Sequence, residues 1–226
     1  MATDPSSLIN KDDGIKYWES IDADVNGMLG GFASITKVDL QGSRNFLAKL
    51  GVGNKTGLRR AKNALEGGAG IGRITQGLLV DVAEQVDVIE PVAKFTAGLE
   101  GKPGVRSIYN IGLEEWEVAE DVQYDLVWIQ WCVGHLTDEQ LVQFLERCKT
   151  ALEPDAGFIV LKENNSSSGV DVFDEIDSSV TRDDGTFRDI FKKAGLRLVK
   201  TELQRGFPRG AGGLLPVRMY ALRPEK

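Results

Sequence analysis

The sequence predicts an α/β fold in which a seven-stranded, mostly parallel sheet carries helices on both of its faces. From residue 61 to the end, short apolar runs alternate with segments of helical spacing, and no internal repeat or long linker interrupts them. Such an alternation is typical of parallel sheets that are covered on both sides. A chain of 226 residues is long enough for one well-buried domain and short for two.

The first 60 residues do not join this alternation. They contain an aromatic segment at 16–18 and a glycine-rich polar segment at 26–32, followed by a helical pattern near 43–50. We therefore expect residues 1–60 to form a helical extension that covers the substrate cleft at the ligand edge of the sheet. Residues 61–226 are expected to form the sheet domain itself.

The expected strands are the apolar runs at 64–66, 86–90, 107–110, 126–130, 157–162, 196–204 and 217–223. The expected helices lie at about 73–80, 91–99, 138–152 and 186–194. The helix at 138 is the best defined, because Thr137 can cap it and Gln140 stands at capping-box spacing. In a sheet of this kind, ligands bind beyond the carboxyl ends of the parallel strands.

Composition excludes several classes of function. The formal net charge of −7 argues against non-specific binding to nucleic acids or membrane surfaces. Cys132 and Cys148 stand at no zinc-ligand spacing, so we expect no disulfide framework and no metal site. No apolar run approaches the roughly 18 residues of a membrane span, and residues 1–10 lack a secretory signal pattern. We expect a soluble protein of a reducing intracellular compartment.

A glycine-rich turn follows the first expected strand, with glycines at every second position: Gly68, Gly70 and Gly72. A dinucleotide fingerprint needs its last glycine one place later, where this chain has Arg73. Glu66 before the turn and Glu90 at the end of the next apolar run suit a nucleoside without phosphates. The pattern indicates an S-adenosylmethionine site. The alternatives are an ordinary strand-to-helix turn for the glycines and a solvated helix-start acid for Glu90.

Two further features carry candidate acid–base chemistry. His135 is the only histidine, and it follows the fourth expected strand, where that strand should meet the ligand. A histidine can accept a proton near neutral pH, although a lone one is more often structural. Asp174 and Asp177 stand three places apart and would share a face of one helical turn. The alternative for this acidic run is a solvated loop.

Several segments in order along most of the chain carry a family resemblance: 17–18, 25–32, 68–73, 129–136, 162–165, 174–182 and 216–222. The Trp-Cys-Val-Gly-His run at 131–135 and the Asp-Ser-Ser-Val run at 177–180 are far more specific than the glycine turn. Together they resemble the N-terminal Xaa-Pro-Lys α-amino methyltransferases. The sequences Lys-Glu-Asn-Asn at 162–165 and Val-Arg-Met-Tyr-Ala-Leu at 217–222 resemble those of the fungal branch of that family.

The resemblance implies a class I (Rossmann-like) methyltransferase fold and an enzyme. The implied reaction moves methyl groups from S-adenosylmethionine to the free α-amino group of proteins that begin Xaa-Pro-Lys after Met removal. S-adenosylhomocysteine is the product, methylation proceeds up to the di- or trimethyl state, and ribosomal proteins are among the expected substrates. No metal is implied. We expect the protein to be a monomer. We expect it in the cytoplasm, with the nucleus as a further location.

The resemblance also implies roles for individual residues. Asp177 would be the general base, and His135 would contact the substrate amine and assist as a base. The implied cofactor-binding residues are Gly68, Gly70, Gly72, Arg73, Glu90, Pro91, Val92, Leu113, Glu114 and Gln130. Arg73 would pair with the cofactor carboxylate, as its planar charged fork allows. Leu113 and Glu114 would meet the adenine edge; the alternative for both is an exposed loop.

The implied substrate-binding residues are Trp18, Leu29, Gly30, Trp131, Asn164, Asp174 and Ser179. Asp174 and Ser179 would hold the third-position lysine, and Asn164 would orient the substrate backbone. Trp18 would line the peptide channel; its alternative is a hydrophobic lid residue. We assign Trp116 and Trp128 to packing.

The chain departs from the family pattern at three places. Leu215 stands where the family commonly has a tyrosine on the substrate side, and Glu90 stands where it usually has Asp. The Ser-rich loop at 166–169 resembles an insertion. Two other functions remain open: a class I methyltransferase that acts on a small amine or a lysine side chain, and a non-enzymatic cofactor-binding subunit. The second predicts a damaged glycine turn or a missing base, and the sequence has neither.

Overall fold

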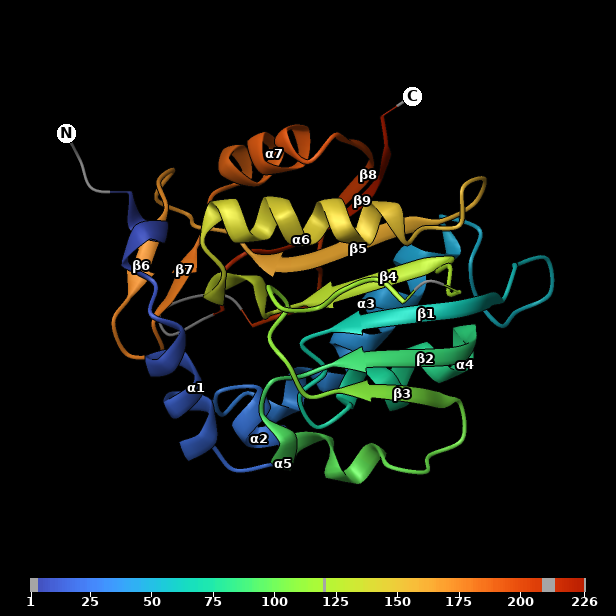
Figure 1. The fold of residues 1–226 in the computed structure, drawn as a ribbon, viewed down its shortest axis with the longest axis horizontal. Coiled ribbons are helices and arrows are strands. Elements are labelled where there is room, and N and C mark those ends of the chain that lie inside the picture. Colours follow the sequence, from blue (N-terminus) through green and yellow to red (C-terminus); the bar gives the residue numbers. More distant parts are fainter. Residues whose placement is uncertain (1–3, 120, 209–213, 226) are drawn as a thin grey trace.

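The computed structural model describes residues 4–119, 121–208 and 214–225. Within them, seven strands form one sheet in the order β3-β2-β1-β4-β5-β9-β8 (Figure 1). The strands are β1 (Ala61–Gly67), β2 (Ala83–Ile89), β3 (Val105–Tyr109), β4 (Leu126–Gln130), β5 (Phe158–Asn164), β8 (Leu196–Leu203) and β9 (Val217–Pro224). The pairs among β1 to β5 are parallel, and β9 is antiparallel to both β5 and β8. The predicted mostly parallel sheet is confirmed.

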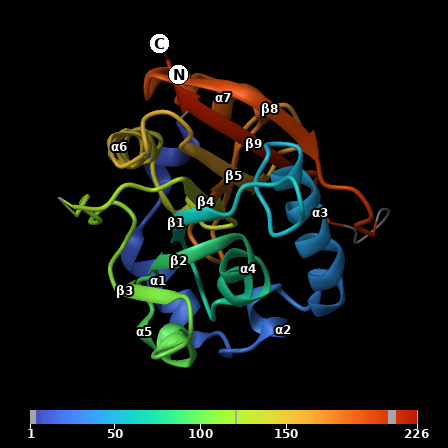
Figure 2. The same cartoon turned by 90° about the vertical axis from the view of Figure 1, so that its right-hand side faces the viewer.

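Helices cover both faces of the sheet, as the alternation predicts. In β4, Val127 and Ile129 pack with α6 (Asp138–Thr150) and α7 (Asp184–Lys193). Leu126 and Trp128 point to the other face, where they join the core formed with α3 (Thr36–Ala48). Figure 2 shows α6 on one side of the sheet and α3 with α4 (Val80–Val82) on the other. Since β4 is buried on both faces, its sequence is apolar from Leu126 to Ile129 without alternation.

The capping box predicted for α6 is confirmed. The Thr137 hydroxyl accepts the Gln140 N–H at 3.2 Å, and the Gln140 side chain accepts the Thr137 N–H at 2.9 Å. The assignment of Trp116 and Trp128 to packing agrees with the structure, because both are fully buried in the core.

The helix that follows the glycine turn is irregular. It consists of a π-helical turn, Thr75–Leu79, and the short α4, in place of one regular helix over 73–80. The segment expected as a helix over 91–99 is divided in the same way, into α5 (Ala93–Thr96) and a 3-10 turn at Ala97–Leu99. Both segments lead away from the ligand edge of the sheet.

The extension contains more helix than the sequence predicted. α3 begins at Thr36 instead of near 43, and two helices precede it, α1 (Lys11–Ser20) and α2 (Val25–Met28). α1 begins where the Asn10 side chain accepts the N–H groups of Asp12 and Asp13. Because α1 has one buried residue, Gly14, it carries no apolar stripe that a periodicity argument could detect.

The prediction that Asp174 and Asp177 share a helical turn is wrong. Asp174 ends a strand, β6 (Val172–Asp174), which pairs with β7 (Ser179–Thr181) as a separate hairpin. Asp177 lies in the turn between them. The Asp174 side chain accepts the Ile176 N–H at 2.8 Å, a local bond that favours a turn over a helix.

The described part of the extension divides into two. α1 and α2 lie beyond the carboxyl ends of β1 and β2 (Figure 1). α3 instead packs in the core, where Phe46 and Leu47 are fully buried. Within the described residues, no helix has the length and apolar character that crossing a membrane requires.

Candidate active site

A pocket lies at the carboxyl ends of β1, β2 and β4, and residues of α1 and α2 line its other side. It brings together most of the residues that the sequence predicted for a site: Trp18, Gly68, Gly70, Arg73, Glu90, Pro91, Val92, Leu113, Glu114, Gln130, Trp131 and His135. The position agrees with the general rule for ligands of parallel sheets.

Other predicted residues lie outside the lining of this pocket: Gly72, Leu29, Gly30, Asn164, Asp174, Asp177 and Ser179. Gly72 faces the core, because a side chain there would collide with Leu99. Asn164 ends β5, and the last three belong to the β6–β7 hairpin and its turn. Leu215, at the family's tyrosine position, is 41% exposed.

The glycine turn forms the floor of the pocket. Gly68 and Gly70 have φ angles of 68° and 53°, in the left-handed region that favours glycine. A side chain at Gly68 would collide with Cys132, and one at Gly70 would come within 2.8 Å of the Met28 sulfur atom. Any side chain at these two positions would therefore clash with a neighbouring residue of the pocket lining. Met28 is a lining residue that sequence reasoning did not single out.

Glu90 is fixed at the end of β2. Its Oε2 accepts the Gly70 N–H at 2.8 Å, and its Oε1 accepts the Val92 N–H at 2.9 Å. Burial raises the pKa of Glu90, and these two hydrogen bonds oppose that rise. The carboxylate joins the glycine turn to the segment at 91–92, where its oxygens can also accept ribose hydroxyls.

Glu66 is a second buried acid in the pocket. Burial raises its pKa to about 8, opposed by a hydrogen bond from the Thr75 hydroxyl at 2.5 Å and by the charge of Arg73. At neutral pH the side chain is therefore mostly protonated.

Arg73 and Gln130 meet at an acid that sequence reasoning missed, Asp39 of α3. Arg73 Nη1 lies 2.7 Å from Asp39 Oδ2, and Gln130 Nε2 donates to both Asp39 oxygens at 3.1 Å. The Arg73 guanidinium also lies 5.4 Å from the centre of the Trp131 ring, within cation–π range. No local pattern marks Asp39, since its role depends on how α3 packs against the sheet.

His135 faces Trp18 across the pocket. Its Nε2 accepts the Trp18 indole N–H at 2.9 Å, so the neutral ring carries its proton on Nδ1. Burial lowers the pKa of His135, and the Asp177 charge and the Ser178 backbone oppose that shift. The ring is thus held in its neutral form.

The α1 backbone runs close to the histidine and the hairpin turn. A side chain at Gly14 would come 3.2 Å from His135 Nδ1 and 3.4 Å from the Asp177 carbonyl oxygen. The Asn10 N–H, at the start of α1, donates to the Ser178 hydroxyl at 2.8 Å. The extension thus holds the acidic turn beside the histidine.

Three buried polar atoms in this region make no hydrogen bond within the described residues: Trp131 Nε1, His135 Nδ1 and Asp177 Oδ1. Buried polar atoms are normally paired, so a group of unpaired ones points to a missing ligand. They are two donors and one acceptor, a set that suits a polar ligand offering both acceptors and a donor.

Two buried charged side chains hold the segment that carries Trp131 and His135. Arg182, the residue after β7, donates to the carbonyl oxygens of Val133 at 3.0 Å and Leu136 at 2.5 Å, and its Nε lies 2.8 Å from Asp138 Oδ1. Glu163 accepts the Cys132 N–H at 3.1 Å, and burial raises its pKa to about 7. Arg182 therefore connects the hairpin to the histidine turn.

The donor set fits S-adenosylmethionine. The glycine floor leaves room for it, Glu90 offers acceptors for a ribose, and Arg73 offers a cation for a carboxylate. Among the described residues, no cluster of three or more His, Cys, Asp or Glu side chains could hold a metal ion.

Comparisons with known proteins agree with this arrangement. A family model described as AdoMet dependent proline di-methyltransferase matches residues 6–223. Alpha N-terminal protein methyltransferase 1 of Schizosaccharomyces pombe is 43% identical over 217 residues, 94% of this chain and 95% of that protein. N-terminal Xaa-Pro-Lys N-methyltransferase 1 of Homo sapiens is 44% identical over 200 residues, 85% of this chain and 86% of its own.

Solved structures share the fold. A SAM-dependent methyltransferase of Leishmania major superposes with a TM-score of 0.84 at 34% identity, covering 98% of this chain and 87% of that one. The 1,6-didemethyltoxoflavin-N1-methyltransferase of Burkholderia thailandensis superposes with a TM-score of 0.68 at 18% identity, covering 100% of this chain and 92% of that one. The second likeness concerns the fold alone.

Proposed function

The chain belongs to the AdoMet dependent proline di-methyltransferase family, and from that premise we propose that it methylates the free α-amino group of proteins that begin Xaa-Pro-Lys. It is an S-adenosylmethionine-dependent enzyme, with S-adenosylhomocysteine as the product. One observation carries the choice of acceptor: the pocket that holds the glycine turn and Glu90 also contains Trp18 and His135, beside the acidic β6–β7 turn.

When bound, S-adenosylmethionine supplies an electrophilic methyl group on its sulfonium. The protein's own task is to deliver a neutral amine with its lone pair aimed at that methyl group. An α-amino group has a pKa of ~7.7–8.0, so a minority is neutral at pH 7. A base that takes the remaining proton after docking needs no unusual strength.

We assign proton removal to Asp177 and an orienting role to His135. Asp177 Oδ1 is buried and has no hydrogen-bond partner within the described residues, so it is available to an ammonium group. His135 Nε2 is occupied by the Trp18 N–H. The proton-bearing Nδ1 can donate a hydrogen bond but cannot accept a proton. Positioning of this kind can be worth ~7–11 kcal/mol in favourable cases.

The terminal sequence Xaa-Pro-Lys suits the surroundings of the pocket. A proline in second position needs no partner for a backbone N–H and presents a preset bend to a narrow channel. Asp174 is exposed on the hairpin next to the Asp177 turn, where it can attract a third-position lysine. We expect an exposed pair of this kind to add only ~0.2–1 kcal/mol. Peptides with another residue in third position should therefore react more slowly than the lysine peptide, but should still react.

We further propose repeated methylation and a monomeric enzyme. After each of the first transfers the amine still has a proton to lose, so Asp177 can act again wherever the pocket has room. The glycine turn, Glu90 and His135 all come from one chain, so the proposed reaction needs no residue from a second copy.

Mass spectrometry of synthetic peptides tests the proposal. A Ser-Pro-Lys peptide incubated with enzyme and cofactor should gain one or more methyl groups. An N-acetylated Ser-Pro-Lys peptide should gain none, and a Ser-Ala-Lys peptide should react more slowly. Methylation of the acetylated peptide, or none of the free one, would refute an α-amino acceptor.

A further inference from the structure

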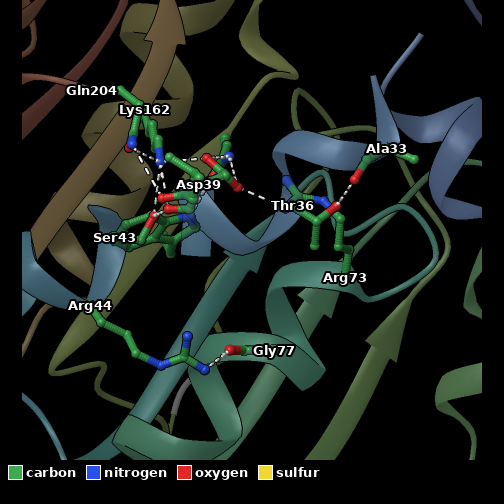
Figure 3. Close-up of polar contacts among 12 residues, drawn as sticks. Ala33, Thr36, Asp39, Ser43, Arg44, Arg73, Gly77, Lys162 and Gln204 are labelled. Atoms are coloured by element: carbon green, nitrogen blue, oxygen red, sulfur yellow. Dashed lines mark hydrogen bonds and ion pairs between the residues drawn. The ribbon is translucent and has the colours of Figure 1, made fainter. Parts of the chain in front are cut away.

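A buried cluster of charges lies behind the cofactor side of the pocket. Figure 3 shows Asp39, Ser43, Lys162 and Gln204 gathered where α3 packs against β5. Asp39 and Lys162 are both fully buried, with Lys162 Nζ at 2.5 Å from Asp39 Oδ1. Lys162 also donates to Ser43 Oγ at 3.0 Å and to Gln204 Oε1 at 2.8 Å.

Asp39 connects this cluster to the pocket lining. Its two carboxylate oxygens meet Arg73, Gln130 and Lys162, which come from three different elements. Arg73 and Gln130 line the pocket, whereas Asp39 and Lys162 do not. Asp39 therefore does not line the pocket itself. It contacts the two side chains, Arg73 and Gln130, that can reach a ligand there.

The charges of the cluster do not balance without a ligand. Arg73 and Lys162 are cations around the single anion Asp39, although burial lowers the pKa of Lys162 to about 8. An incomplete balance is costly in a buried site, and an anion at Arg73 would complete it. The α-carboxylate of the cofactor is such an anion.

We propose that Asp39 is a positioning residue that holds Arg73 and Gln130 in the orientation needed to bind the carboxylate end of the cofactor. Lys162 is the buried partner of Asp39 on the side away from the pocket. This role rests on the proposed function only for the identity of the methyl donor. A failure at Asp39 would leave the proposed acceptor untouched, and a wrong acceptor would leave the role of Asp39 untouched.

The test compares two ligands that differ in the carboxylate. S-adenosylhomocysteine carries the complete amino-acid part, whereas 5′-methylthioadenosine keeps the nucleoside and the sulfur but has no carboxylate. For Asp39→Asn, calorimetric titration should show S-adenosylhomocysteine weakened on the order of 10- to 100-fold, the range expected for losing a hydrogen bond to a charged group. Binding of 5′-methylthioadenosine should change by less than about threefold. Equal weakening of both ligands, or of neither, overturns the proposal.

A matched control comes from the same helix. Arg44 also ties α3 to the sheet domain, through the Gly77 carbonyl oxygen and through Asp81 at 3.3 Å, but it makes no contact with Asp39 (Figure 3). Arg44→Met should leave both affinities within about twofold of the original protein. If Arg44→Met reproduces the loss for S-adenosylhomocysteine, the effect belongs to the packing of α3 and not to Asp39.

A double variant separates positioning from stability. Asp39→Asn alone leaves two buried cations, so it should lower the melting temperature as well. Asp39→Asn combined with Lys162→Met removes one anion and one cation, and should recover much of the melting temperature while S-adenosylhomocysteine binding stays weak. Recovery of both together would show that Asp39 only stabilises the fold. If the single variant does not fold, the affinities for S-adenosylhomocysteine and 5′-methylthioadenosine are compared in the double variant instead.

Discussion

At the scale of single residues, the candidate base and the groups around it have separable roles. Asp177 does not line the cofactor pocket, whereas His135 does and is fixed by Trp18. A change at Asp177 should therefore affect turnover without affecting the binding of the methyl donor.

We expect Asp177→Asn to lower kcat by about 10²- to 10⁴-fold, the usual contribution of a general base. The S-adenosylhomocysteine dissociation constant should stay within about twofold. Glu175→Gln is the matched control, because Glu175 is an exposed acid of the same turn. Steady-state kinetics with a Ser-Pro-Lys peptide checks both variants; equal losses from both would assign the effect to the charge of the turn.

Glu66 predicts a pH dependence of stability. Burial raises its folded pKa to about 8, whereas the unfolded value is near 4.5. The folded state then binds more protons between these values, so this contribution is complete below about pH 4.5 and is lost as pH rises towards 8. In the ligand-free protein, Glu66→Gln should reduce the fall in melting temperature between pH 5 and 8. Glu84→Gln, at an exposed position of β2, should not.

Residue positions were predictable from the sequence where a motif fixes them. The glycine spacing and the apolar run before Glu90 indicated a ligand turn, the family resemblance added Arg73, and Gly70, Arg73 and Glu90 all line the pocket. Asp39 could not be found in this way, because nothing in the sequence around a carboxylate on a mostly polar helix indicates that it is buried. Its contacts form only when α3 packs against three separate elements.

At the scale of elements, the β6–β7 hairpin and the turn that carries His135 form one unit through Arg182. Its guanidinium is fully buried and satisfies two backbone carbonyl groups of that turn. Removal of the guanidinium leaves both without that partner, which costs roughly 1–3 kcal/mol.

Arg182→Met should thus lower the melting temperature and raise the KM for the peptide, with little change in cofactor affinity. Arg188→Met is the control, since Arg188 is half-exposed and pairs with Asp184 within α7. That variant should change stability by less than about 0.5 kcal/mol. A KM unaffected by Arg182→Met would show that the hairpin and the histidine turn act independently.

The sequence predicted elements well where burial is complete. Strands such as β4 are apolar on both faces, so their runs are unbroken and their bounds were close to those observed. The β6–β7 hairpin was missed because its strands have three residues each, and only Val180 among them is buried. α1 was missed because it is held by its cap and by close contact at Gly14, and not by an apolar stripe.

At the scale of the whole molecule, the extension predicted over residues 1–60 combines two roles. α1 and α2 close the pocket, and Lys11 at the start of α1 reaches Glu114 at 2.7 Å and Glu115 at 3.0 Å across it. α3 belongs to the core. We propose that the covering part ends before α3.

Two truncations test this division. Removal of residues 1–31 should leave a folded sheet domain that has lost peptide methylation, because Trp18 and Met28 are gone from the pocket. Removal of residues 1–60 should abolish folding, since losing buried side chains such as Phe46 costs about 3–5 kcal/mol each. Circular dichroism and activity assays distinguish the outcomes; a folded product of the longer deletion would contradict the division.

The proposed reaction places the methyl group on the α-nitrogen of the substrate. Fragmentation mass spectrometry of the product formed from a Ser-Pro-Lys peptide locates the added mass directly. The arrangement of Trp18, His135 and Asp177 beside the cofactor pocket predicts all of the mass on the first residue. Methylation of the lysine side chain would contradict it.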